Sequence, residues 1–91
     1  MVQAYPVMNT YFGLLAEFGT AEIPLEHVAP KYFGLSLDQA KRRAAENRLP
    51  VPVYRAGSQK APWLVSADLL ANYLDEQKKR ASETYVKMNA A

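Results

Sequence analysis

Apolar residues recur along the chain at the 3–4 residue spacing of a buried helix face in four segments. The first predicted helix starts at a capping Asn9 or Thr10 and ends before Gly19. The second runs from Leu25 to about Phe33. Pro30 lies inside it, where a proline removes one backbone hydrogen bond and clashes with the preceding turn, so we expect a kink or two short helical pieces.

A tight turn at Gly34-Leu35 separates the second helix from a third. The third helix begins with a capping box, Ser36–Gln39, in which two side chains satisfy free backbone donors at the helix start. It runs to about Asn47. Its inward positions include the small residues Ala40 and Ala44, so this helix can pack closely against the second, with its long polar residues outward.

Two β-like runs follow, Val51–Arg55 and Ala61–Val65, and they flank the polar turn AGSQK. Together they predict a hairpin with a basic tip. Pro52 would interrupt a regular sheet ladder, so the first run should be an edge strand. Trp63 is expected to be the main anchor of the core.

The fourth predicted helix starts after a capping Ser66 and has its packing face in the stretch up to Leu74. Beyond that residue the sequence is hydrophilic, but acid-before-base pairs four residues apart should keep it helical to about Lys87. These pairs are Asp75–Lys79, Glu76–Arg80 and Glu83–Lys87.

The order of elements is helix, helix, tight turn, helix, hairpin, helix. It predicts a mainly α fold with a small β-hairpin wing, which is a winged helix-turn-helix. We expect a tail at residues 1–7, the winged helix-turn-helix domain at 8–76, and a C-terminal helix extension at 77–91. A chain of 91 residues is long enough for one such domain.

The net charge of +2 is distributed unevenly along the chain. Residues 1–40 carry a net charge of −3, residues 41–60 carry +5, and residues 61–91 carry none. All the excess positive charge therefore lies in the third helix and the hairpin, which indicates an anionic partner.

In a helix-turn-helix the second helix of the pair enters the DNA major groove. Arg42 and Arg43 suit guanine edges or phosphates, Gln39 suits adenine, and Ser36 at the helix start can hold a phosphate. The hairpin tip offers a second group that can follow the backbone or enter the minor groove. Its members are Arg55, Ser58, Gln59 and Lys60.

A basic helix face taken alone is more often a solvated surface than a DNA reader. Here the two basic groups are separated by apolar strand residues, so only the fold brings them together, and this favours DNA binding.

Other chemistry has weak support in the sequence. Cysteine is absent, and the single histidine, His27, has no ligand partner nearby, so we expect no metal site, no cofactor and no enzyme activity. Apolar runs are far shorter than the roughly 20 residues of a membrane span, and no signal peptide is predicted. These features predict a cytoplasmic protein.

Several stretches resemble the pyocin activator PrtN family over about residues 8–85. They read IPLEHV, YFGLS and AKRRA, then LPVPVYR, SQKAPWLV and ADLLANYLD. Members of that family are small bacterial and prophage regulators that switch on bacteriocin genes by binding DNA boxes upstream of them. More loosely, the order of elements is similar to excisionase-like and MerR-type winged helices.

The resemblance implies sequence-specific binding to double-stranded DNA and transcriptional activation, with RNA polymerase as a further partner. It assigns the recognition-helix role to Asp38, Gln39, Lys41, Arg42 and Arg43. It assigns the wing role to Arg55, Ser58, Gln59 and Lys60.

Two alternatives remain open. The chain can be an excisionase-like architectural protein that bends DNA, or a prophage protein-interaction module that uses its last helix. Leu70, Leu74, Ala81 and Met88 form a rough seam on that helix, interrupted by Gln77. The seam suggests a homodimer or a cooperative oligomer on DNA, which suits repeated half-sites.

Overall fold

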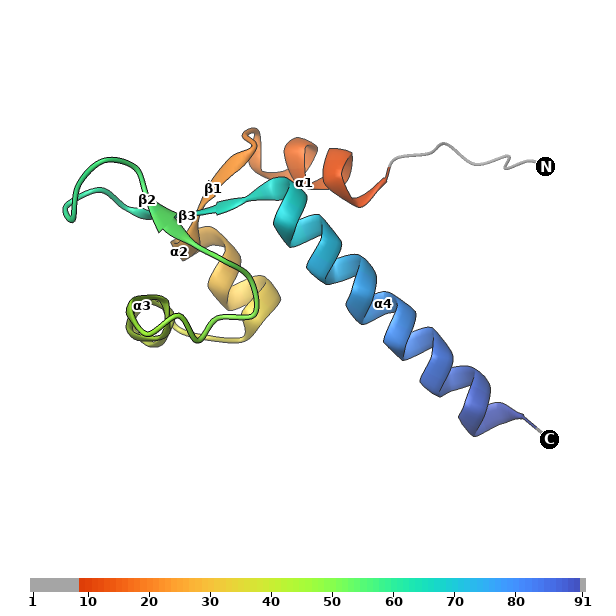
Figure 1. The fold of residues 1–91 in the computed structure, drawn as a ribbon. Helices are drawn as coiled ribbons and strands as arrows, with labels where there is room; N and C mark the ends of the chain where they lie inside the picture. The colour runs from red at the N-terminus through yellow and green to blue at the C-terminus, as the bar shows by residue number, and fades with distance from the viewer. Residues whose placement is uncertain (1–8, 91) are drawn as a thin grey trace.

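The computed structural model describes residues 9–90, so the tail expected at residues 1–7 lies outside the described residues. The fold is mostly helical with one small antiparallel sheet, as the sequence pattern predicts (Figure 1). In chain order the elements are α1 (Thr10–Phe18), β1 (Glu22–Pro24), α2 (Leu25–Val28), the π-helical segment η1 (Ala29–Phe33), α3 (Leu37–Ala45), β2 (Tyr54–Arg55), β3 (Trp63–Ser66) and α4 (Ala67–Asn89).

The sheet has three strands, where the sequence pattern predicted a two-stranded hairpin. Strand β3 is central, between β1 and β2, and both pairings are antiparallel. Strand β1 joins because Ile23 lies opposite Val65 and both side chains are fully buried. Three residues are too few to show the alternation that identifies a strand in a sequence. The hydrophobic contact with β3 is what stabilises β1.

Strand β2 is an edge strand, as expected, but it is shorter than the predicted run Val51–Arg55. Only the last two residues of the predicted run, Tyr54 and Arg55, pair with β3. Pro52 has no N–H to donate to a ladder, and the three residues before it form a bend instead. Val51 nevertheless packs into the core with 5% of its surface exposed.

The core lies where the inner face of the sheet meets α2, α3 and the start of α4. Its largest fully buried side chains are Ile23, Leu25, Val28, Val65 and Leu70. Trp63 is not the central anchor that the sequence suggested, since it is only partly buried at the edge of this cluster. Its side chain is on the same face of β3 as that of Val65, but it lies two residues nearer the connection between β2 and β3.

The helix around Pro30 forms two pieces, as expected. Helix α2 ends at Val28 and continues directly as η1, with the proline near the start of the π-helical segment. Gly34 ends η1 with φ at 67°, a left-handed conformation that glycine adopts without steric cost. The N–H of Leu35 donates to the carbonyl of Ala29 over 3.1 Å, which closes the turn before α3.

The predicted capping box at the start of α3 is confirmed. The Ser36 hydroxyl accepts from the Gln39 N–H over 3.2 Å, and the Gln39 side-chain oxygen accepts from the Ser36 N–H over 3.0 Å. The helix ends at Ala45, slightly before the expected Asn47. Asn47 adopts φ of 54°, and the following N–H of Arg48 donates to the carbonyl of Arg43 over 2.8 Å, a Schellman ending with asparagine in the left-handed position.

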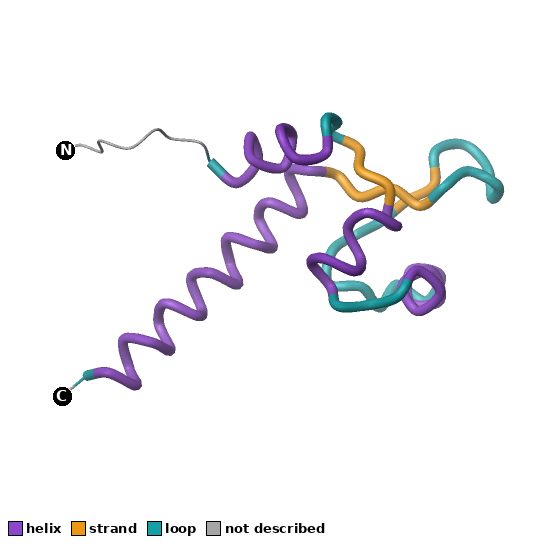
Figure 2. Tube along the Cα trace, turned by 180° about the vertical axis from the view of Figure 1, so that it is seen from behind, coloured by secondary structure: helices purple, strands orange, loops and turns teal. Residues whose placement is uncertain are grey.

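Helix α4 is a rod of about 35 Å whose first half packs against α1 and the sheet. From Ala81 onward every described residue of the helix is exposed, and Figures 1 and 2 show this end pointing away from the body. Among the described residues only Glu76–Arg80 forms the expected ion pair, at 3.9 Å. Asp75 accepts a hydrogen bond from Thr10 of α1 instead, and so ties the two helices together.

Ser66 precedes α4 in an extended conformation, but its side chain does not cap the helix. Its hydroxyl donates to Glu22 across the sheet, over 3.4 Å. The first N–H of the helix, on Ala67, donates to the carbonyl of Ala21 over 2.7 Å. Ala21, the residue before β1, therefore takes over part of the capping role that the sequence assigned to the serine.

The capping box gives a direct test of how α3 is held. Ser36→Ala should lower the free energy of unfolding by about 1 kcal/mol, because a backbone donor at the helix start loses its partner. Urea denaturation followed by circular dichroism measures this loss. Ser82→Ala makes the same change within an exposed helix and should leave the midpoint almost unchanged. A Ser36→Ala midpoint equal to that of the unsubstituted protein would contradict the capping role.

Candidate nucleic-acid interface

Helix α3 presents its cationic side chains to solvent. Ala40 and Ala44 are buried against the body, with 0% and 2% of their surface exposed, and they fix the rotation of the helix. At about 100° per residue, Arg42 lies opposite them, and Lys41 and Arg43 flank it on either side. All three basic side chains are exposed, and the outward direction of Arg42 and Arg43 is the one that the sequence predicted.

The start of α3 contains three of the predicted contact residues, Ser36, Asp38 and Gln39. Asp38 is exposed in the first turn, where a negative charge is favourable to the helix dipole. The side-chain oxygen of Gln39 accepts from both the N–H and the hydroxyl of Ser36, over 3.0 and 3.2 Å. In this conformation Gln39 serves the capping box, and a two-bond contact with adenine requires its oxygen to share or leave that position.

Arg48 is a basic residue that the sequence interpretation counted in the charge but left out of the candidate contacts. It lies beside Arg42 and Arg43 around a shallow hollow at the end of α3. Its guanidinium forms an exposed ion pair with Glu46 at 3.1 Å. The only feature of the sequence that pointed to Arg48 as a contact residue was its place in the +5 segment, because Arg48 lies beyond the end of the helix.

The connection between β2 and β3 forms the predicted turn. Gly57 adopts φ of 96°, and the Ser58 hydroxyl accepts from the N–H of Lys60 over 3.1 Å. Ser58, Gln59 and Lys60 are all exposed. The tip is therefore a hydrogen-bonded turn that projects beyond the sheet (Figure 1).

Arg55 behaves differently from the other three predicted residues of the tip. It donates to the backbone oxygen of Gln59 over 2.7 Å, and its guanidinium carbon lies 4.3 Å from the centre of the Trp63 ring. Arg55 therefore also makes contacts within the folded hairpin, in addition to its predicted place in the wing. Arg55 and Trp63 are opposite each other in the register of β2 and β3, so both side chains turn toward the same face of the sheet.

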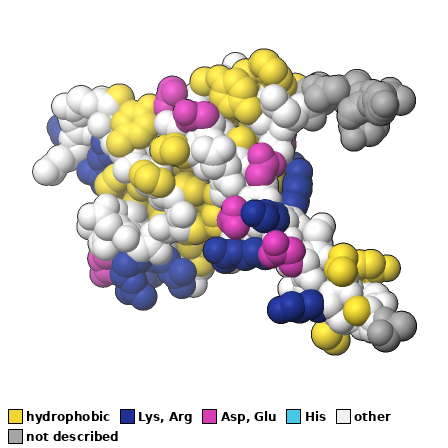
Figure 3. All heavy atoms as spheres, turned by 45° about the vertical axis from the view of Figure 1, so that its right-hand side comes forward, with side chains coloured by type: hydrophobic (Ala, Val, Ile, Leu, Met, Phe, Trp, Pro, Cys, Tyr) yellow, Lys and Arg dark blue, Asp and Glu magenta, His cyan; other side chains and the backbone are white. Residues whose placement is uncertain are grey.

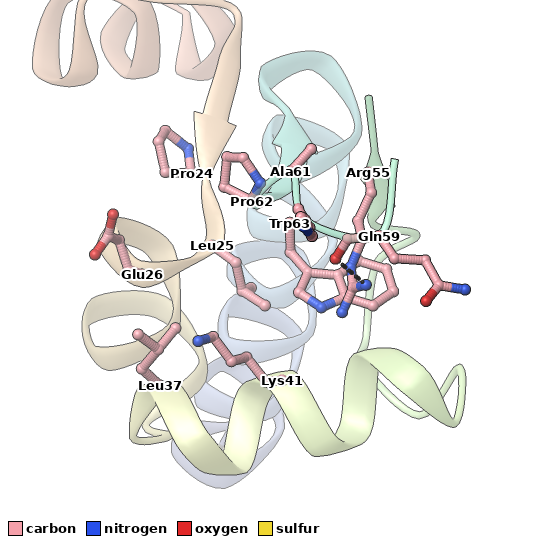
Figure 4. A pocket seen from close by; sticks show the side chains of 11 residues that line it. Pro24, Leu25, Glu26, Leu37, Lys41, Arg55, Gln59, Ala61, Pro62 and Trp63 are labelled. Carbon is pink, nitrogen blue, oxygen red and sulfur yellow. Dashed lines mark hydrogen bonds between the residues drawn. The ribbon is translucent and has the colours of Figure 1, made fainter. Parts of the chain in front are cut away.

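A hollow of about 250 Å³ separates the wing from α3 (Figure 4). Leu37 and Lys41 enter it from α3, and Arg55 and Trp63 enter it from the sheet. The rest of its lining is Pro24, Leu25, Glu26, Gln59, Lys60, Ala61 and Pro62. The fold thus brings the basic helix and the basic hairpin to two sides of one depression.

Lys31 lies outside this surface. It forms an ion pair with Glu17 of α1, and its ammonium group is 5.2 Å from the centre of the Tyr32 ring. The hydrogen bond from Lys31, together with one from the Tyr32 hydroxyl at 2.7 Å, lowers the pKa of Glu17. This lysine is engaged in joining η1 to α1.

Figure 3 shows basic side chains gathered along the lower part of the body and apolar side chains near the free end of α4. His27 is exposed on α2, and no group of three potential metal ligands occurs in residues 9–90. Within the same part of the chain, no helix is both long and apolar enough to cross a membrane.

Comparison with known proteins assigns the chain to a family. The family model described as "Pyocin activator protein PrtN" matches residues 10–81, which includes α1, the sheet, α3 and most of α4. Searches of curated proteins and of solved structures give no significant match. The match covers most of the chain and agrees with the resemblance in its sequence, so the chain belongs to the pyocin activator protein PrtN family.

Proposed function

We propose that this chain is a winged helix-turn-helix protein that binds promoter DNA with α3 and the β2–β3 hairpin. Membership of the PrtN family makes it a pyocin gene activator, which is a transcriptional regulator and not an enzyme. The proposal adds how the chain recognises its target. The partner is double-stranded DNA carrying promoter boxes, and the place of action is the bacterial cytoplasm.

The observation that carries this proposal is the common placement of the two basic groups. Lys41 of α3 and Lys60 of the hairpin tip line the same hollow from two sides, and Arg42 is exposed on the outer face of α3 next to Lys41. Both elements lie on the side of the body away from α4 (Figure 1). This is the arrangement that a helix in the major groove and a wing on the adjacent backbone require.

The dimensions of α3 suit this role. Nine residues make a helix about 14 Å long, and the major groove of B-DNA is about 12 Å wide. Arg42, at the centre of the exposed face, is placed to read guanine edges, while Arg43 on the flank is placed to contact phosphates. Ser36 and Gln39 hold the helix start, and Asp38 can accept from a cytosine amino group.

Of the seam predicted on α4, Leu70 is fully buried in the core of the same chain and Leu74 packs against that core, so the seam is wrong in its first half. Only the free end of α4 is left to support a pairing role. Its exposed apolar residues are Tyr85, Val86 and Met88, with 69%, 64% and 80% of their surface exposed. We propose a second copy of the chain as the occupant, because repeated promoter boxes favour a dimer whose two recognition helices face successive half-sites. Contact with RNA polymerase remains a prediction.

Binding should be specific and strongly dependent on salt. We expect fluorescence anisotropy to give a lower dissociation constant for a pyocin-promoter duplex than for a scrambled duplex of equal length. The logarithm of the binding constant should fall linearly with the logarithm of salt concentration, because phosphate contacts release counterions. Equal affinities would contradict sequence recognition, and no binding at low salt would contradict DNA binding altogether. Bending of the duplex without activation of transcription in vitro would favour the architectural alternative.

The helix and the wing should respond differently to substitution. Arg42→Ala should lose about 1–3 kcal/mol of discrimination at particular base pairs, while Lys60→Ala should weaken binding evenly across sequences. Anisotropy with a set of duplexes that differ by single base pairs measures both effects. Lys79→Ala, at an exposed position on α4, should change neither. Uniform weakening by Arg42→Ala would show that this residue contacts only the backbone.

The pairing role of α4 predicts a change in molar mass. The double variant Tyr85→Glu, Met88→Glu places two charges on the exposed end of the helix and should convert a dimer into a monomer, as measured by light scattering. Both residues are outside the core, so the fold should be retained in circular dichroism. An unchanged molar mass would remove this part of α4 from the interface.

A further inference from the structure

The hollow between α3 and the wing contains buried hydrogen-bond donors without acceptors. The indole Nε1 of Trp63 and the Nε of Arg55 are both buried, and neither has a hydrogen-bond partner in the described part of the chain. Both side chains line the hollow (Figure 4). A buried donor that loses water without gaining an acceptor is unfavourable, so the site favours a ligand that carries acceptor oxygens.

The charge of the hollow favours an anion. Lys41 enters from α3, and Arg55 and Lys60 enter from the wing, against the single carboxylate of Glu26 at the start of α2. Lys41 and Lys60 are exposed, so a ligand can reach both from solvent. Cationic side chains therefore outnumber carboxylates around the hollow, which is the balance expected of a phosphate site.

The donors are held in place before any ligand arrives. Arg55 donates to the backbone oxygen of Gln59 over 2.7 Å and stacks on the Trp63 ring at 4.3 Å. The register of β2 and β3 fixes Arg55 opposite Trp63. A volume of about 250 Å³ is below the 300–1,000 Å³ of sites for drug-sized ligands, so the hollow suits a small group.

We propose that this hollow binds one phosphate of the DNA backbone, between the groove that holds α3 and the stretch contacted by the wing. Lys41 Nζ and the Trp63 Nε1–H donate to the phosphate oxygens, Lys60 contributes charge at the rim, and Arg55 is a positioning residue that holds the indole. The inference rests on the proposed DNA binding and deepens it. Lys41 then fixes the register of α3 on the duplex and does not read bases.

Two variants test this site in the full chain. Lys41→Gln should reduce the salt dependence of promoter binding by about one unit of slope, because one phosphate contact is lost. Lys79→Gln on α4 is the matched control and should keep the original slope. Trp63→Phe keeps an aromatic ring for Arg55 but removes the N–H, and should weaken binding by about tenfold in anisotropy with labelled DNA. Circular dichroism establishes that each variant is folded.

Trp63 is the single tryptophan of the chain, so its intrinsic fluorescence reports directly on the hollow. Titration of the unsubstituted protein with promoter duplex should change this fluorescence, and Lys41→Gln should shift the change to higher DNA concentration. A parallel titration with inorganic phosphate separates the two sources of the anion. A change with inorganic phosphate that DNA does not reproduce would overturn the assignment to the DNA backbone.

The outcomes separate this inference from the function on which it rests. If the unsubstituted protein does not bind DNA in anisotropy, the proposed function fails. If it binds, but Lys41→Gln has the same salt slope as Lys79→Gln, DNA binding stands and the phosphate site is wrong. Should Trp63→Phe fail to fold, the slope of Lys41→Gln decides the matter alone.

Discussion

The pairing of β3 with a strand on each side determines the arrangement of the other elements. On one side it holds β1, so the chain enters α2 from the edge of the sheet. On the other side β3 pairs with β2, and this pairing sets the direction of the hairpin. The end of β3 continues directly into α4. The contact of Ile23 with Val65, both fully buried, is the centre of this pairing. Without it, α2 and the hairpin would have no common support, and α3 would have no fixed position relative to the wing.

The inner face of the same strand divides into a structural part and a surface part. Val65 faces the core, whereas Trp63, two residues earlier on that face, reaches the opening between α3 and the wing. One alternating strand therefore supports the fold at one end and shapes the candidate binding surface at the other. This explains why the tryptophan is half-buried and why an arginine covers it.

Local signals in the sequence predicted the helices well. The capping box Ser36–Gln39, Gly19 and Pro30 each act within a few residues, and the structure has a helix start, a helix end and a change of helix type at these places. The spacing of Ala40 and Ala44 also gave the outward direction of the arginines correctly. These features depend on backbone chemistry that the neighbouring residues decide.

Contacts between distant segments were beyond the sequence pattern. Strand β1 exists because of a partner about 40 residues away, and the role of Arg55 depends on the register of β2 against β3. The use of Gln39 in the capping box, at the expense of a free amide for base reading, follows from the rotamer that the helix start selects. The outward direction of Arg42 and Arg43 was thus predictable from local spacing, but the contacts of Arg55 with Trp63 and Gln59 were not.

The outer half of α4 has a consequence for how the molecule responds to thermal fluctuation. In a single copy of the chain, the helix from Ala81 to its end is held by its own backbone hydrogen bonds, and an isolated helical segment of this length is only marginally stable in water. Local unfolding should therefore begin at this end, and the first hydrogen bonds to α1 that oppose it are those of Lys78 and Asp75 with Thr10. Amide protons should exchange with solvent fastest at the tip and progressively more slowly toward Leu70, so the helix forms a gradient of local stability and not a uniform rod.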